Sequence, residues 1–322
     1  MAKYILGRSL RKNAEAAQWL QRFLWAVDFL LVGALLLLFR LLPIDTASAT
    51  GAWLGRVIGP RLEKNRHLRH NFELAFPQKP AAAIDQLVSD AWANGGAVLA
   101  EYPHLNRIAN SPDRLHVQCA DTIQVFDNPA RPAIFVTMHQ ANWELTAATV
   151  AKLGVPLSCL YTPPSNPWLA EKLVRERAAM GVELLPRDAN IRRLIEALEN
   201  GRSLGIVMDR RVDSGEPVPF FGMPKQTTLL PARLAIKYGY ELIPTQIERL
   251  ADSHFLTTFH TPIKAEREAG SELDQAIEMT QRINVMFEEW VRLAPDEWLC
   301  SKRLWSKGQQ PASNSLSTPL EA

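Results

Sequence analysis

The hydrophobic residues follow two alternating patterns between positions 81 and 293. Short apolar runs bounded by turn residues predict buried strands, whereas apolar residues repeated every three or four positions predict helices. The predicted strands are Leu115–Cys119, Ala133–Met138, Val155–Tyr161, Val182–Leu185, Ser203–Met208, Glu241–Ile247 and His254–His260. The predicted helices are Ala81–Leu105, Trp143–Leu153, Pro167–Met180, Ile191–Glu199, Leu230–Tyr238 and Glu272–Leu293. This alternation favours an α/β fold with a mostly parallel central sheet and helices on both faces.

One apolar segment is long enough to interact with a membrane. Residues 23–39 contain a single charge, Asp28, and Arg22 and Arg40 flank them. Because a span needs about 17–25 mostly apolar residues, the segment predicts an N-terminal membrane-anchor helix that crosses the bilayer or lies at its surface. Two alternatives stay open: a cleaved signal peptide, with small residues at positions 46–49 as its cleavage site, and a buried helix of a soluble protein.

The pattern divides the chain into three regions. Residues 1–60 are expected to hold the anchor and a linker, because Gly51, Gly55, Gly59 and Pro60 follow the apolar segment. Residues 61–307 form the predicted main domain. Residues 308–322 are polar and lack apolar periodicity, so they are expected to be a disordered C-terminal tail.

Composition excludes several classes of protein. The formal net charge is +2 and the pI is near 8.4, which does not favour a nucleic-acid partner. Cys119, Cys159 and Cys300 are far apart, so neither a disulfide framework nor a zinc site is expected. The chain also lacks a Walker loop and a GxGxxG motif, which argues against a P-loop enzyme and a dinucleotide-binding protein.

A histidine and a glutamate follow the second predicted strand. His139 stands directly after Ala133–Met138, at a strand end where active sites of parallel sheets lie. Glu144 begins the next helix, so a turn can bring its carboxylate to the imidazole. A carboxylate that holds one imidazole nitrogen as N–H leaves the other nitrogen free to accept a proton. We therefore predict that His139 is a general base, supported by Glu144, for acyl transfer to a hydroxyl group.

These residues also have a purely structural interpretation. A histidine after a strand is often a hydrogen-bonded loop residue, and a glutamate in a first turn complements the helix dipole. His67 and His70 are three residues apart, which suits metal ligands, but they lie in or beside a basic segment, residues 61–69. We interpret that segment as a basic helix that faces a membrane or a phosphate, and no metal is expected.

Several sequence blocks point to one family. The form H-x4-[DE] from His139 to Glu144 is typical of the glycerolipid and lysophospholipid acyltransferase superfamily. The further blocks are Asn65 with Asn71–Pro77, Asn142–Glu144, Ser165–Pro167, Asp209 with Gly215, Val218–Gly222 and Glu297–Lys307. In this order they resemble the late, or secondary, lipid A biosynthesis acyltransferases over roughly residues 20–307. Three residues depart from that pattern: Thr162 in place of an arginine, Arg210 in place of a glutamine, and Ser301 in place of a histidine.

The resemblance implies an O-acyltransferase of lipopolysaccharide biosynthesis. It would move a fatty acyl chain from an acyl carrier protein thioester to a hydroxyl of a lipid A precursor, without a metal or another cofactor. It implies a location at the bacterial inner membrane, in contact with membrane lipids and with the catalytic domain on the cytoplasmic face.

Other residues near the strand ends are expected to bind substrate. Arg187 and Arg210 follow predicted strands and suit a phosphorylated acceptor, because a guanidinium forms bidentate bonds with phosphate. Asp209 is assigned to the same site, in a role that fixes the neighbouring loop amides. Backbone amides of residues 140–142, or an arginine, are candidates to stabilise the oxyanion. The residues expected to form the wall of an acyl pocket are Phe220, Phe221 and Gly222.

Three other functions stay open. The same chemistry would serve another lipid acceptor, such as an ornithine lipid or a phosphatidylinositol mannoside, because the blocks describe the reaction and not the acceptor. A membrane-bound thioesterase would use water as the acceptor. A non-enzymatic membrane scaffold would need the anchor and the basic segment but not His139.

Overall fold

The computed structural model describes residues 18–186, 191–266, 270–306 and 308–309. Its centre is a seven-stranded sheet of order β1-β9-β8-β2-β5-β3-β4. The strands are β1 (Leu115–Cys119), β2 (Ala133–Thr137), β3 (Leu157–Tyr161), β4 (Val182–Pro186), β5 (Ser203–Val207), β8 (Glu241–Arg249) and β9 (Phe255–Phe259). All neighbouring strands are parallel except β8 and β9. The predicted α/β fold with a mostly parallel sheet is therefore confirmed.

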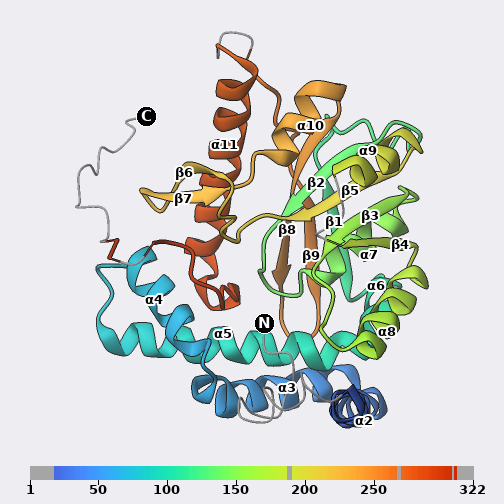
Figure 1. The fold of residues 1–322 in the computed structure, drawn as a ribbon, viewed down its shortest axis with the longest axis vertical. Helices are drawn as coiled ribbons and strands as arrows, with labels where there is room; N and C mark the ends of the chain where they lie inside the picture. Colours follow the sequence, from blue (N-terminus) through green and yellow to red (C-terminus); the bar gives the residue numbers. More distant parts are fainter. Residues whose placement is uncertain (1–17, 187–190, 267–269, 307, 310–322) are drawn as a thin grey trace.

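Helices cover both faces of this sheet (Figure 1). They are α6 (Leu105–Ala109), α7 (Glu144–Lys152), α8 (Pro167–Ala178), α9 (Ile191–Glu199), α10 (Leu230–Tyr238) and α11 (Glu272–Leu293). Helices α4 (Asn65–Ala75) and α5 (Ala81–Glu101) lie under one end of the sheet. Strand β2 shows why both faces are covered, since all of its residues are buried. Ile134 and Val136 pack into a core with α9, α10 and α11, whereas Ala133 and Phe135 pack on the opposite side with Val150 of α7.

The expected linker after the apolar segment is instead a helix, α3 (Ile44–Ile58), which runs beside α5 under one end of the sheet (Figure 1). Gly51 and Gly55 are one turn apart, so they lie on one face of α3. A Cβ atom at either position would overlap the backbone of Gly96 or Trp92 on α5. These glycines therefore permit close helix packing, and they do not mark a flexible connection.

The N-terminal apolar segment forms helix α2 (Gln18–Leu41), with a mean hydropathy of 2.1 over its most apolar part. By length and composition it is the one helix of the described chain that is able to cross a membrane. It also packs on the domain along its length. Asn166 Nδ2 donates to the carbonyl of Trp25 over 2.8 Å, and His104 Nε2 lies 2.9 Å from the carbonyl oxygen of Phe39. The large apolar side chains exposed on α2 are Trp19, Phe23, Leu30, Leu31, Leu37, Leu38 and Leu41.

A two-stranded antiparallel hairpin, β6 (Glu216–Phe220) and β7 (Met223–Thr227), was not predicted. Pro217, Pro219 and Pro224 hide it in the sequence, because proline lacks an N–H for the ladder and argues against a strand. The expected C-terminal tail lies outside the described residues from position 310 onward.

Candidate active site

His139 and Asp209 meet at the carboxyl ends of two neighbouring strands. The parallel register of β2 and β5 pairs Thr137 with Val207, so each side chain lies two residues beyond the last pair. His139 Nδ1 lies 2.6 Å from Asp209 Oδ1, and the backbone N–H of His139 donates to Asp209 Oδ2 over 3.3 Å. The register of the sheet therefore brings a carboxylate to the imidazole from 70 residues away.

Asp209 is fully buried and ionised. The indole N–H of Trp298 donates to its Oδ2 over 3.2 Å. Burial by itself raises the pKa of a carboxyl group, but the imidazole of His139 and the charges of Arg210 and Lys225 outweigh it and lower the pKa of Asp209 to about 2. The carboxylate consequently accepts the hydrogen of Nδ1, and Nε2 of His139 is left to accept a proton.

A buried lysine lies behind Asp209. Lys225 of β7 is fully buried, its Nζ donates to the backbone carbonyl of Asp209 over 3.2 Å, and Nζ is 4.1 Å from the ring centre of Phe220. Burial lowers the pKa of Lys225 to about 8, although the carboxylate of Asp209 opposes this shift. The His139–Asp209 pair thus has a positive charge beside it that no sequence pattern indicated.

Glu144 does not make the predicted contact with His139. It is the first residue of α7, and its carboxylate forms an ion pair with Arg177 of α8. The side chain of Arg177 is only 5% exposed, so its charge requires a counter-ion. Arg177 Nη1 also donates to the backbone carbonyl of Glu144 over 3.3 Å. The carboxylate on the imidazole is therefore Asp209, and Glu144 is held at the cavity wall by a different partner.

A cavity of about 710 Å³ opens beside His139, a size typical of sites for small molecules and lipid chains. Much of its wall is apolar and comes from α2, α5, α7, α8, α9, α10 and the sheet. The main apolar residues are Val32, Leu36, Leu99, Phe135, Val150, Leu157, Leu160, Leu173, Leu184, Leu194 and Leu230. The polar and charged residues on its wall include Thr137, His139, Glu144, Lys172, Arg177, Arg210 and Thr228. A proton acceptor thus lies on the wall of a largely apolar cavity.

The two predicted arginines have different outcomes. Arg210 follows Asp209 and lines the cavity. It forms no salt bridge with any residue that the structure describes, in contrast to Arg211, which pairs with Asp213. Arg210 is therefore available to an anionic group of a ligand. Arg187 lies outside the described residues.

The predicted acyl-pocket wall at the hairpin is corrected by the structure. Among the described residues, the cavity wall does not include Phe220, Phe221 or Gly222. The two phenylalanine rings pack around Trp298, with ring centres 6.0 and 6.1 Å from the indole. Phe221 and Gly222 have φ angles of 52° and 69°, which suits the two-residue turn of a hairpin. These residues therefore support Trp298, and through it Asp209.

The loop that follows His139 uses most of its own amides. The N–H of Gln140 donates to the carbonyl of Met138 over 2.9 Å, and that of Ala141 donates to the carbonyl of Glu297 over 3.1 Å. Two of the three amides considered for an oxyanion are thus already engaged. Within residues 18–309, without the gaps given above, no three His, Cys, Asp or Glu side chains are placed to hold a metal ion together.

Comparisons with known proteins point to lipid acyltransferases. A family model described as bacterial lipid A biosynthesis acyltransferase matches residues 16–307. The chain is 24% identical over 269 residues to a lipid A biosynthesis palmitoleoyltransferase of Escherichia coli, which covers 80% of this chain and 84% of that protein. It is 26% identical over 213 residues to a phosphatidylinositol mannoside acyltransferase of Mycobacterium tuberculosis, which covers 63% of this chain. The chain spans 66% of the length of that mycobacterial relative, just under two thirds. The resemblance seen in the sequence blocks is confirmed.

Proposed function

The chain belongs to the bacterial lipid A biosynthesis acyltransferase family, and from this premise we propose that it is an O-acyltransferase. Its donor is a fatty acyl thioester of acyl carrier protein, and its acceptor is a hydroxyl of a lipid A precursor. The observation that carries the proposal is His139, held by the buried Asp209, on the wall of a largely apolar cavity.

The reaction needs one base and no covalent enzyme intermediate. Nε2 of His139 removes the proton of the acceptor hydroxyl as its oxygen attacks the thioester carbonyl carbon. Asp209 holds the imidazole by Nδ1 and stabilises the imidazolium that forms. The tetrahedral intermediate then breaks its C–S bond, and the imidazolium returns the proton to the departing thiolate. The products are a new ester and the free thiol of the carrier protein.

The cavity and helix α2 account for the lipid substrates. Val32 and Leu36 of α2 line the cavity, while other apolar side chains of the same helix are exposed. An acyl chain in the cavity would therefore lie against a helix whose outer face suits lipid. We place α2 at the bacterial inner membrane, in contact with membrane lipids, with the catalytic domain on the cytoplasmic side where the carrier protein is available.

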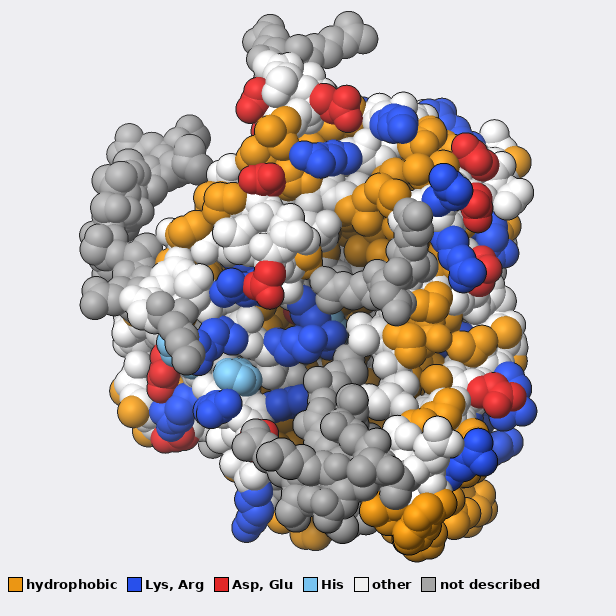
Figure 2. All heavy atoms as spheres, in the orientation of Figure 1, with side chains coloured by type: hydrophobic (Ala, Val, Ile, Leu, Met, Phe, Trp, Pro, Cys, Tyr) orange, Lys and Arg blue, Asp and Glu red, His pale blue; other side chains and the backbone are white. Residues whose placement is uncertain are grey.

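Basic residues suit the anionic groups of both substrates. Figure 2 shows Lys and Arg side chains gathered with a histidine on one face of the molecule. On α4, His67 lies close to Arg66, His70 and Arg303. Burial lowers the pKa of His67, and these neighbouring positive charges lower it further. We propose that the acidic carrier protein docks on the cluster of Arg66, His67, His70 and Arg303. We propose that Arg210, at the cavity, binds a phosphate of the acceptor.

A phosphatidylinositol mannoside is a second candidate acceptor. Curated relatives include phosphatidylinositol mannoside acyltransferases, one of them 26% identical to this chain. A mannoside acceptor also presents a sugar hydroxyl beside a phosphate, so the same base and the same arginine would serve it.

The test is a transfer assay with the full-length protein in detergent. Acyl carrier protein charged with a fatty acid is the donor, and a lipid A precursor or a phosphatidylinositol mannoside is the acceptor, with ester product measured by mass spectrometry. We expect ester on the lipid A precursor and a loss of about 10²–10⁴-fold in kcat for His139→Ala. If ester forms on the mannoside alone, the acceptor of this enzyme is the mannoside and not the lipid A precursor. Free fatty acid without any ester would identify a thioesterase, and unchanged activity of His139→Ala would refute the mechanism.

A further inference from the structure

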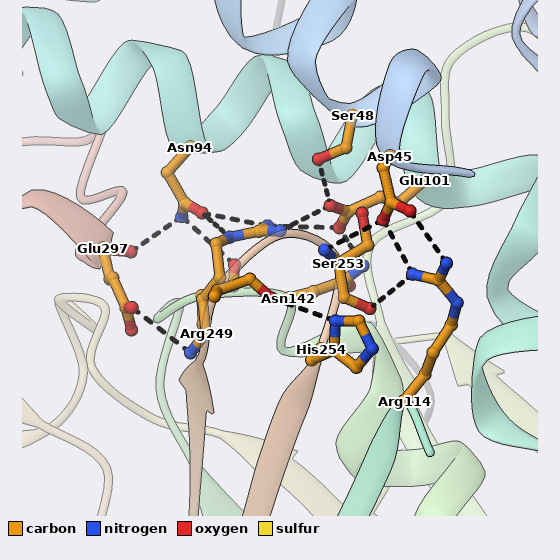
Figure 3. Close-up of polar contacts among 12 residues, drawn as sticks. Asp45, Ser48, Asn94, Glu101, Arg114, Asn142, Arg249, Ser253, His254 and Glu297 are labelled. Carbon is orange, nitrogen blue, oxygen red and sulfur yellow. Dashed lines mark hydrogen bonds and ion pairs between the residues drawn. The ribbon is translucent and has the colours of Figure 1, made fainter. Parts of the chain in front are cut away.

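A buried polar network contacts the loop between His139 and Glu144, and Figure 3 shows its side chains. Its centre is Glu101, which is fully buried and accepts hydrogen bonds from three different elements. Ser48 Oγ of α3 donates over 2.5 Å, Asn142 Nδ2 of the loop over 2.8 Å, and Arg249 Nη1 of β8 over 2.5 Å. None of these four side chains is among the described residues that line the cavity. The network therefore acts on the active site from outside the cavity, and the loop that follows His139 is one of its contacts with the site.

A second branch of the network holds the backbone of the same loop. Asn94 Nδ2 donates to the carbonyl of Ala141 over 3.1 Å and to the carbonyl of Glu297 over 2.9 Å. Its Oδ1 accepts from Arg249 Nη2 over 3.2 Å. The N–H of Ala141 also donates to the carbonyl of Glu297 over 3.1 Å. Both polar backbone groups of Ala141 are thus fixed by partners distant in sequence.

Ala141 has an unusual backbone conformation that needs such support. Its φ angle is 43°, in the left-handed region that residues with a Cβ atom rarely adopt. Such a conformation persists only where the surroundings determine it, and it often occurs at functional sites. Here it lies two residues after His139, whose own carbonyl accepts from the N–H of Leu299 over 2.9 Å. The direction of the loop after the base is therefore set by its contacts with Asn94 and residues 297–299.

Fold stability does not explain why the network is charged. Glu101 is the last residue of α5, where the helix dipole disfavours a negative charge. Its side chain is 0% exposed and that of Arg249 is 17% exposed, so both charges have lost most of their hydration. Apolar residues of similar size often stabilise a fold as well as a buried ion pair does. A carboxylate that accepts and an arginine that donates in fixed directions are, however, suited to hold one loop conformation.

We infer that Glu101, Asn94 and Arg249 are positioning residues, which fix the loop after His139 and thereby the orientation of the imidazole toward the cavity. The inference rests on the proposed function, because it assigns these side chains to the reaction at His139. They act through Asn142 and Ala141, and they touch neither substrate.

The test exchanges the two members of one hydrogen bond. Glu101→Gln and Asn142→Asp each weaken the hydrogen bond from Asn142 to Glu101. The first substitution removes the negative charge of residue 101, and the second places two carboxylates side by side. In the double variant, the amide of residue 101 donates to the carboxylate of residue 142, which also restores a negative charge near Arg249. We expect each single variant to lower kcat by about 10²-fold, as small misplacements of a catalytic group do. The KM values of donor and acceptor should change by less than roughly threefold. The double variant should regain at least about tenfold of kcat over either single variant.

The matched control is another ion pair of the same region. Arg114 pairs with Asp45 of α3 through Nη1–Oδ1 and Nη2–Oδ2 distances of 2.7 and 2.8 Å, and neither residue contacts the loop (Figure 3). Arg114→Met should lower Tm and leave kcat near that of the unchanged protein. All assays are run well below the Tm of each variant.

The outcomes separate this inference from the proposed function. A double variant that is no more active than its parents, or an Arg114→Met variant that loses as much kcat as Glu101→Gln, would overturn the positioning role. If Glu101→Gln does not fold, Asn142→Ala removes the same bond without unpairing Arg249, and full activity of that variant refutes the inference. Failure of the proposed function is seen independently, as full activity of His139→Ala.

Discussion

Asp209 and Glu144 are two carboxylates at the same end of the sheet, and their surroundings differ sharply. Asp209 is fully buried, and its two oxygens accept from His139 and Trp298. The side chain of Glu144 is 23% exposed, lines the cavity and neutralises Arg177. The carboxylate that is distant in sequence therefore contacts the imidazole, whereas the near one does not. In a parallel sheet, equal register positions of neighbouring strands meet whatever their separation along the chain.

The largest expected effect comes from Asp209→Asn. The amide keeps the size of the side chain but no longer fixes Nδ1 as the donor or stabilises the imidazolium, so kcat should fall by about 10²–10⁴-fold. The KM values of both substrates should stay close to their original values, because Asp209 does not line the cavity. Initial rates of ester formation measure this. Asp45→Asn, in an ion pair remote from the loop, is the control. A loss below about tenfold would remove Asp209 from the mechanism.

The second effect separates the arginines that follow β5. Arg210 lines the cavity without a salt bridge among the described residues, whereas Arg211 is neutralised by Asp213. Arg210→Ala should raise the acceptor KM by about 10–10²-fold, the size expected for a hydrogen bond to a charged group, with kcat little changed. Added salt should shrink the difference, because screening already weakens the original contact. Arg211→Ala is the matched control. A larger change in the KM of the carrier-protein donor would assign Arg210 to the donor instead.

Much of this arrangement follows from sequence, and the rest depends on strand order. The alternating pattern predicts all seven strands of the sheet, and it places His139 and Asp209 directly after two of them. It does not indicate that β2 and β5 are neighbours, because no local pattern encodes which strands pair. The nearer carboxylate, Glu144, was therefore the natural partner to predict. Trp298 and Lys225 were missed for the same reason, since they reach Asp209 from elements far along the chain.

The sequence did not show whether Gly51 and Gly55 belong to a linker or to a packed helix. A spacing of four between Gly51 and Gly55 fits both a flexible linker and one face of a packed helix. In the structure both glycines pack against the backbone of α5, which shows that they belong to a packed helix. The local sequence pattern does not reveal this contact.

A smaller effect on activity is expected for Glu144→Gln. The amide still accepts a hydrogen bond from Arg177 but leaves that buried charge without a counter-ion. Unfolding should therefore become easier by about 1–3 kcal/mol, which lowers Tm. kcat should fall by less than about tenfold, because the imidazole keeps its own carboxylate. Thermal unfolding and initial rates measure the two quantities. If Glu144→Gln loses as much kcat as Asp209→Asn, then Glu144 supports the base, as the sequence pattern predicted.

The smallest effect concerns the charge behind Asp209. Because burial lowers the pKa of Lys225 to about 8, the folded state disfavours its charged form relative to the unfolded chain. A lysine with a lowered pKa in the folded state makes the protein less stable at pH 7. The penalty fades as pH rises from about 8 toward the ordinary lysine pKa of about 10.4. Lys225→Met should thus raise Tm at pH 7, and the gain should shrink between pH 8 and pH 10.

The same variant should lose activity at a higher pH than the unchanged protein when the solution is acidified. The positive charge of Lys225 favours the carboxylate form of Asp209, which holds Nδ1 of His139. Without it, Asp209 should be protonated at a higher pH, so that the acid limb of kcat/KM moves to higher pH while activity near pH 8.5 is unchanged. Lys237→Met is the control, because Lys237 of α10 lies over Tyr238 and away from Asp209. A variant that is less stable at pH 7 with an unmoved acid limb would show that Lys225 supports packing alone. If Lys225→Met is instead more stable and the acid limb of its kcat/KM profile moves to higher pH, then the buried charge of Lys225 supports the reaction and lowers the stability of the fold.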